Sequence, residues 1–119
     1  MNDYVSMNQD DKYIRVYFQN EMDKPFAIGE KMYELNQDAY MNGYNWDALF
    51  NYYLAKHAPD LLDGLESDPE AGSYVAYYKP SPENEGKAQK FVEIIRALIE
   101  NEEELYRIVR EEGNEIEWD

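Results

Sequence analysis

The chain combines a high negative charge with many aromatic residues, and this combination restricts how it can fold. Its 119 residues carry 26 acidic and 11 basic side chains, a formal net charge of −15 at pH 7. Disordered acidic segments are poor in aromatic residues, but this chain contains 12 tyrosines, 4 phenylalanines and 2 tryptophans. We therefore expect a single domain spanning residues 1–119, with a packed apolar core and its carboxylates on the outside.

The sign of the charge limits the partners of such a domain. A strongly acidic surface repels nucleic acid and anionic membranes, and it attracts basic proteins. The charge is also uneven, because residues 100–119 carry nine acidic and two basic side chains. We expect no binding to nucleic acid or membrane, and we expect the field that attracts a basic partner to be strongest over residues 100–119.

Several sequence features are typical of a soluble cytoplasmic protein. The chain has no cysteine, as is common in a reducing compartment. Residues 1–5 show no basic region followed by an apolar run, which a secretory signal would contain. The apolar runs fall far short of the ~20 residues that cross a membrane. We expect a monomer or a weak homodimer in the cytoplasm.

Two segments have the pattern of β-strands. Apolar and polar residues alternate over residues 12–19, which predicts a half-buried strand with an aromatic outer face. Residues 65–79 predict a hairpin in which Asp68–Gly72 form the turn and the return strand is rich in tyrosine. Gly72 is expected to adopt the positive φ that closes this turn.

Apolar residues recur at helical spacing in four further segments, which are residues 25–39, 46–57, 88–99 and 102–112. We expect Gly43 to end the first helix in the left-handed conformation and Asn45 to cap the second. The capping-box spacing of Asn101 and Glu104 predicts a new helix start. The order of elements predicts an α+β fold, with a small antiparallel sheet (one N-terminal strand plus the hairpin) packed with about four helices.

No arrangement of catalytic or metal-binding residues is recognisable in the sequence. The single histidine, His57, lies near a helix end, and the chain has neither cysteine nor threonine. The adjacent acids Glu102–Glu104 and Glu111–Glu112 point in different directions on a helix. Neither an EF-hand loop nor a phosphate-binding glycine loop is present. We therefore predict no catalytic, cofactor-binding or metal-binding residues, and a protein that is not an enzyme.

The tyrosines and the C-terminal acids admit two interpretations. The tyrosine rings could cover the sheet with their hydroxyls in water, and the acids could form a solvated helix face. Alternatively, aromatic anchors with an acidic rim could bind a basic protein, since Tyr and Trp are frequent at interface hot spots. On the second interpretation the candidate partner-binding residues are Tyr13, Tyr17, Tyr74, Tyr78, Glu102, Glu103, Glu104, Glu111 and Trp118.

Two motifs resemble the signature stretches of a known family. Residues 42–46 read Asn-Gly-Tyr-Asn-Trp, and residues 68–77 read Asp-Pro-Glu-Ala-Gly-Ser-Tyr-Val-Ala-Tyr. With the strand before them and the helix after them, they resemble the immunity protein 51 family of bacterial polymorphic toxin systems over residues 12–100. The motif residues, which we expect to hold the fold, are Gly43, Tyr44, Asn45, Trp46, Asp68, Pro69 and Gly72.

The resemblance implies a small cytoplasmic protein that binds a cognate toxin and neutralises it by occlusion. An acidic inhibitor would suit a basic toxin, for example a nuclease, whose active site attracts phosphates. Two alternatives remain open: an acidic scaffold or adaptor with no toxin partner, and a small enzyme that uses carboxylates and a divalent metal. The enzyme would require a cleft in which acids converge with raised pKa values.

Overall fold

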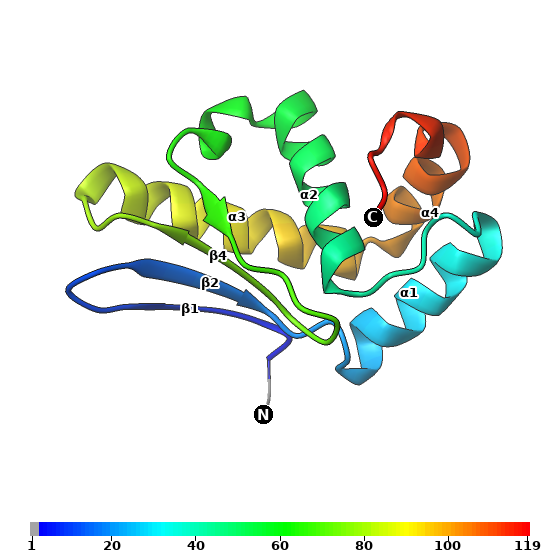
Figure 1. Ribbon diagram of the computed structural model, residues 1–119, viewed down its shortest axis with the longest axis horizontal. Coiled ribbons are helices and arrows are strands. Elements are labelled where there is room, and N and C mark those ends of the chain that lie inside the picture. The colour runs from blue at the N-terminus through cyan, green and yellow to red at the C-terminus, as the bar shows by residue number, and fades with distance from the viewer. Residues whose placement is uncertain (1–2) are drawn as a thin grey trace.

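The computed structural model describes residues 3–119, which form a four-stranded antiparallel sheet with helices on one face and beyond one end (Figure 1). The strands are β1 (Val5–Gln9), β2 (Ile14–Phe18), β3 (Glu66–Ser67) and β4 (Tyr74–Tyr78), in the order β1-β2-β4-β3. The helices are α1 (Asp23–Leu35), α2 (Gly43–His57), α3 (Pro82–Glu100) and α4 (Glu102–Glu111), with short 3-10 helices η1 (Pro59–Leu62) and η2 (Gly113–Glu115). The predicted α+β class is confirmed.

The central pair of strands follows the predicted alternation. In β2, Ile14, Val16 and Phe18 are buried, and the residues between them are half-buried. Strand β4 pairs antiparallel with β2 and places Ala76 opposite Val16. The predicted hairpin is also present, because β3 pairs with β4. One face of this central pair of strands is therefore buried, and the other is partly open to solvent.

Strand β1 was not predicted from the sequence. It pairs antiparallel with β2 along its whole length, and Val5 lies opposite Phe18. Val5 is buried, but the remaining β1 residues are exposed or half-buried. An edge strand that buries so few side chains has a weak apolar alternation, and its position depends on backbone pairing with β2.

Aromatic side chains from the sheet and two helices form the centre of the core. The ring of Phe18 lies 5.0 Å from that of Trp46 and 5.5 Å from that of Phe50, both on α2. The ring of Phe50 also lies 5.2 Å from Tyr74 of β4 and 5.8 Å from Phe91 of α3. All five side chains are at most 1% exposed. This cluster, which includes Trp46, joins the inner face of the sheet to α2 and α3.

The two signature motifs contact each other, although 21 or more residues separate them. The N–H of Gly43 donates a hydrogen bond of 3.0 Å to the carbonyl oxygen of Ala71. A Cβ atom on Gly43 would lie 1.8 Å from the carbonyl oxygen of Glu70 and 2.3 Å from that of Ser73. Glycine is therefore required here because the start of α2 lies directly against the backbone of the β3–β4 loop.

The conformations predicted for the motif residues are wrong in three places. Gly43 begins α2 instead of ending α1, and the side chain of Asn42, not Asn45, caps α2 by accepting the N–H of Asn45 at 3.0 Å. Gly72 does not adopt a positive φ; within residues 3–119 that conformation occurs at Gly64 alone. Outside the motifs, helix α1 ends earlier than predicted, at Leu35 instead of Ala39.

Asn45 has a different role from the predicted cap, because it joins three parts of the chain. Its side-chain amide donates to the carbonyl oxygen of Tyr40 at 2.7 Å. Its side-chain oxygen accepts the N–H of Asp119 at 2.6 Å. Asn45 is 2% exposed, so it fixes both the segment before α2 and the C-terminal end against the buried start of this helix.

We expect Gly43→Ala to destabilise the protein by about 3 kcal/mol or more, because backbone oxygens cannot move away as a flexible side chain can. Gly86→Ala is the matched control: a Cβ on Gly86, in α3, meets no atom within 4 Å, and alanine favours a helix by about 0.5–1 kcal/mol. Urea unfolding of both variants measures the difference. Equal stability of the two variants would show that the motifs do not need this close contact.

Candidate functional site

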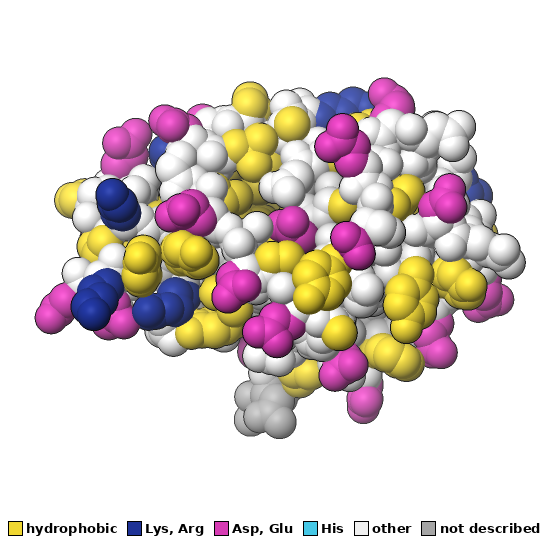
Figure 2. Space-filling view, in the orientation of Figure 1, with side chains coloured by type: hydrophobic (Ala, Val, Ile, Leu, Met, Phe, Trp, Pro, Cys, Tyr) yellow, Lys and Arg dark blue, Asp and Glu magenta, His cyan; other side chains and the backbone are white. Residues whose placement is uncertain are grey.

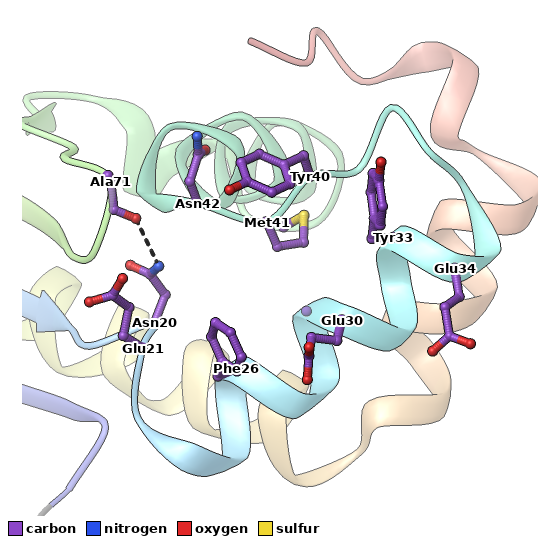
Figure 3. Close-up of a pocket in the computed structure, with 11 residues that line it drawn as sticks. Asn20, Glu21, Phe26, Glu30, Tyr33, Glu34, Tyr40, Met41, Asn42 and Ala71 are labelled. Carbon is purple, nitrogen blue, oxygen red and sulfur yellow. Dashed lines mark hydrogen bonds between the residues drawn. The ribbon is translucent and has the colours of Figure 1, made fainter.

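A surface groove of about 420 Å³ lies between α1 and the segment of residues 40–42 (Figure 3). Phe26 of α1 points into the opening, and Tyr40 and Met41 lie across from it. Helix α1 and the segment before α2 thus form its two sides. The residues that line it are Asn20, Glu21, Phe26, Gly29, Glu30, Tyr33, Glu34, Tyr40, Met41, Asn42 and Ala71.

Helix α1 presents apolar side chains on two faces, which is unusual for a helix at the edge of a domain. Ile28 and Met32 are buried against the rest of the protein. Phe26 and Tyr33, which lie seven residues apart on the opposite side, are 50% and 43% exposed. Tyr40 is 65% exposed, and its ring centroid lies 5.9 Å from that of Tyr33. These outward rings contribute little to the core, so folding alone does not explain them.

Two further glycines shape the groove. A Cβ on Gly29 would lie 3.0 Å from the Cβ of Met41, so the absence of a side chain lets α1 approach the segment before α2. A Cβ on Gly72 would lie 2.6 Å from Oε1 of Glu21, so this motif glycine makes room for a carboxylate at the groove. Together with the contact of Gly43, they let the segments around the groove approach one another closely.

The groove is lined by acids and by no bases among the described residues. Glu21, Glu30 and Glu34 contribute carboxylates, although Glu34 points away from the opening (Figure 3). In Figure 2 the lower right of the face shown carries hydrophobic and acidic side chains side by side, whereas the Lys and Arg side chains in view lie at the left, upper and right edges. The groove therefore combines exposed aromatic surface with a negative potential.

Two of the predicted partner-binding tyrosines are in the core, so their predicted outward orientation is wrong. Tyr74 and Tyr78 are 0% and 1% exposed, and they share the inner face of β4 with Ala76. The hydroxyl of Tyr78 donates to the carbonyl oxygen of Leu61, which lets a polar group be buried without loss of its hydrogen bond. Burial raises the pKa of both tyrosines, and neither side chain can contact a partner.

The other two predicted tyrosines lie on the outer face of the sheet. Tyr13 and Tyr17 are half-buried, and they line a shallow hollow together with Arg15 and Tyr77. The rings of Tyr13 and Tyr77 meet edge to face at 5.0 Å, and Arg15 is paired with Asp10 at 2.8 Å. Much of this surface is already covered by contacts within the sheet.

The predicted acids of α4 divide into exposed and paired groups. The helix begins at Glu102 as predicted, but the side chain of Asn101 makes no capping hydrogen bond. Glu102 and Glu103 are exposed. Glu104 accepts two hydrogen bonds of 2.9 Å from Arg107, and Glu111 lies 3.7 Å from the same guanidinium. Part of the C-terminal charge is therefore neutralised within the protein.

Glu112, which sequence analysis did not single out, is the centre of a polar network that joins α4 to α2. Its carboxylate accepts hydrogen bonds from Tyr52, from Lys56 at 2.6 Å and from Arg107 at 2.7 Å. The side chain is 11% exposed. The hydrogen bond from Lys56 is the largest effect, and with those from Tyr52 and Arg107 it lowers the pKa of Glu112 to about 2.

Trp118 and Tyr44 also differ from their predicted positions. Trp118 is half-buried instead of an exposed anchor, and its Nε1–H donates to the carbonyl oxygen of Gly113 at 3.1 Å. It lines a second hollow between α2 and the C-terminal segment, together with Glu115 and Glu117. Tyr44, which was expected to hold the fold, lies at the surface and is 42% exposed.

Within residues 3–119, no group of three or more His, Asp and Glu side chains is placed to hold a metal ion. The ring of His57 lies 4.4 Å from that of Tyr53, at the end of α2. No helix in the described part of the chain is long and apolar enough to cross a membrane.

Comparison with known proteins identifies one family. The model of the family described as immunity protein 51 matches residues 5–114, which includes strand β1, the two motifs and α4. The match thus extends beyond residues 12–100, for which the resemblance was predicted. No curated protein and no solved structure matches the chain.

We expect Glu112→Gln to destabilise the protein by about 2 kcal/mol at pH 7, because a charged acceptor of three partly buried hydrogen bonds is lost. The pKa of Glu112 is depressed to about 2, so its contribution is present above the unfolded pKa of about 4.3 and is lost as the pH falls through the folded value. The difference between wild type and variant, measured by urea unfolding, should therefore shrink below about pH 5. Glu102→Gln, at an exposed position of α4, is the control and should change stability by less than about 0.5 kcal/mol. A pH-independent difference would show that the carboxylate charge is unimportant.

Proposed function

Because the chain belongs to the immunity protein 51 family, whose model matches residues 5–114, we propose that it binds a cognate toxin protein and neutralises it by occlusion. The family match is the observation that carries this proposal. The protein would act by covering a surface of the toxin and would carry out no chemistry of its own. The complex is proposed to contain one copy of each protein.

The distribution of charged groups supports a binding function over an enzymatic one. The strongest pKa depression on a carboxylate of the helical layer belongs to Glu112, and its cause is ion pairing that holds α4 to α2. The pKa of Asp47 is raised by burial, and the side chains that hydrogen-bond to it are Ser67 and Asn51. Glu115, Glu117 and Asp119 line the same hollow, but none of them contributes to this shift. Exposed aromatic rings are enriched at protein interfaces, and unpaired carboxylates around them favour a basic partner.

The partner is proposed to be a basic toxin, and a nuclease is the class that this charge suits best. Nuclease surfaces near the active site are positive, and so they attract the phosphates of the substrate. A protein with a net charge of −15 would be attracted to the same surface. The proposed location is the cytoplasm, where such a toxin would meet its substrate.

We expect the toxin domain encoded beside this gene to bind the purified protein in a 1:1 complex, and co-expression to restore growth of cells that produce the toxin. Because charge accelerates the encounter, the association rate should fall by about tenfold or more between about 0.02 M and about 0.5 M NaCl. Stopped-flow fluorescence measures the rate. A neighbouring gene product that neither harms cells nor binds would contradict the proposal, and capture of several unrelated host proteins instead would indicate an adaptor.

A further inference from the structure

We propose that the groove between α1 and residues 40–42 is where this protein contacts its toxin, and that it receives a segment of the toxin that carries lysine or arginine. This inference rests on the proposed function, and it adds the surface and the chemistry of the contact. The partner-binding residues predicted from the sequence lie elsewhere, on the sheet, on α4 and in the C-terminal segment.

The first support is the distribution of exposed apolar surface. In the part of the chain that the structure describes, the most exposed large hydrophobic side chains are Phe26, Tyr33, Tyr40 and Tyr44. All four come from residues 26–44, and three of them line the groove. Aromatic side chains exposed together in one concave area, next to polar groups, are typical of protein-binding sites.

The second support is the state of the charges. Some of the acids of α4 and of the end of α3 are paired within the protein, as Glu104 is with Arg107 and Glu100 is with Lys24. Among the ion pairs of residues 3–119, none involves Glu21, Glu30 or Glu34. The groove therefore offers carboxylates that no base of the described chain neutralises.

The third support is the fit of this surface to a long basic side chain. Lys and Arg have an apolar stem and a charged end, and the groove has apolar walls with carboxylates at its edge. Their cations are also attracted to the faces of aromatic rings, which Phe26, Tyr33 and Tyr40 supply. At the end of the groove the side chain of Asn20, which is 2% exposed, donates a hydrogen bond of 3.2 Å to the carbonyl oxygen of Ala71.

The fourth support is the construction of the groove by the motif glycines. Gly72 is a signature residue, and its lack of a Cβ leaves room for Glu21 at the groove; the signature residue Gly43 lets α2 begin directly against the backbone of Glu70 and Ser73, next to residues 40–42. Gly29 likewise leaves room for Met41. A rigid groove limits the entropy lost on binding, because fewer groups must be ordered when the partner arrives.

The test measures how tightly the toxin domain encoded beside the gene binds two groove variants and two matched controls. Tyr40→Ser removes an exposed ring, and Glu30→Lys reverses an exposed charge. The controls are Tyr17→Ser on the outer face of the sheet and Glu102→Lys on α4. Circular dichroism and Tm show that each variant is folded.

We expect Tyr40→Ser to raise the Kd at least about tenfold, as for an aromatic hot spot. Glu30→Lys should slow association and weaken its dependence on salt. Both controls should leave the Kd within about twofold of wild type. If Tyr40→Ser and Glu30→Lys bind like wild type, the groove is not the site. The same holds if the two controls lose as much affinity as the two groove variants. Failure of the wild-type protein to bind the toxin would remove the proposed function itself.

Discussion

The close contact between Gly43 and the β3–β4 loop is the constraint on which the rest of this structure depends. It joins the first residue of α2 to the backbone of residues 70–73, and so it joins the helical layer to the sheet. The same contact determines where residues 40–42 lie, since they immediately precede α2. The outward rings of α1 then face that segment across a groove. A single backbone contact thus links the two signature motifs to the shape of the surface.

The negative charge of the protein has two physical roles in this arrangement. Some carboxylates form ion pairs that tie distant parts of the chain together, as Glu112 does between α2 and α4 and Asp3 does with Arg96 of α3. These ion pairs occupy basic side chains, which are then not available to neutralise other carboxylates at the surface. The remaining acids stay uncompensated, among them those at the groove. The charge of −15 is therefore both a means of joining elements and a source of attraction for a basic partner.

Sequence patterns predicted the parts of the fold in which apolar residues repeat regularly. Strand β2, the β3–β4 hairpin and α3 were predicted because burial on one face leaves a period of two or of 3.6 residues. The pattern of β4 shows that Tyr74, Ala76 and Tyr78 share a face, but it does not show which face is inward. Tyrosine suits either environment when its hydroxyl finds a partner, and Tyr78 finds one in Leu61. The groove was missed because its walls come from a helix and an irregular segment whose proximity depends on Gly29 and Gly43.

Hydrogen exchange of backbone amides, with and without the cognate toxin domain, tests most directly whether the surface built by the motifs is the binding surface. Contact with the partner would exclude water from the segment between α1 and α2, which lies outside any regular helix or strand. The account predicts slower exchange in residues 36–42 and along the exposed face of α1, with α4 and the C-terminal segment unchanged. Slower exchange confined to residues 100–119 or to the outer face of the sheet would contradict it.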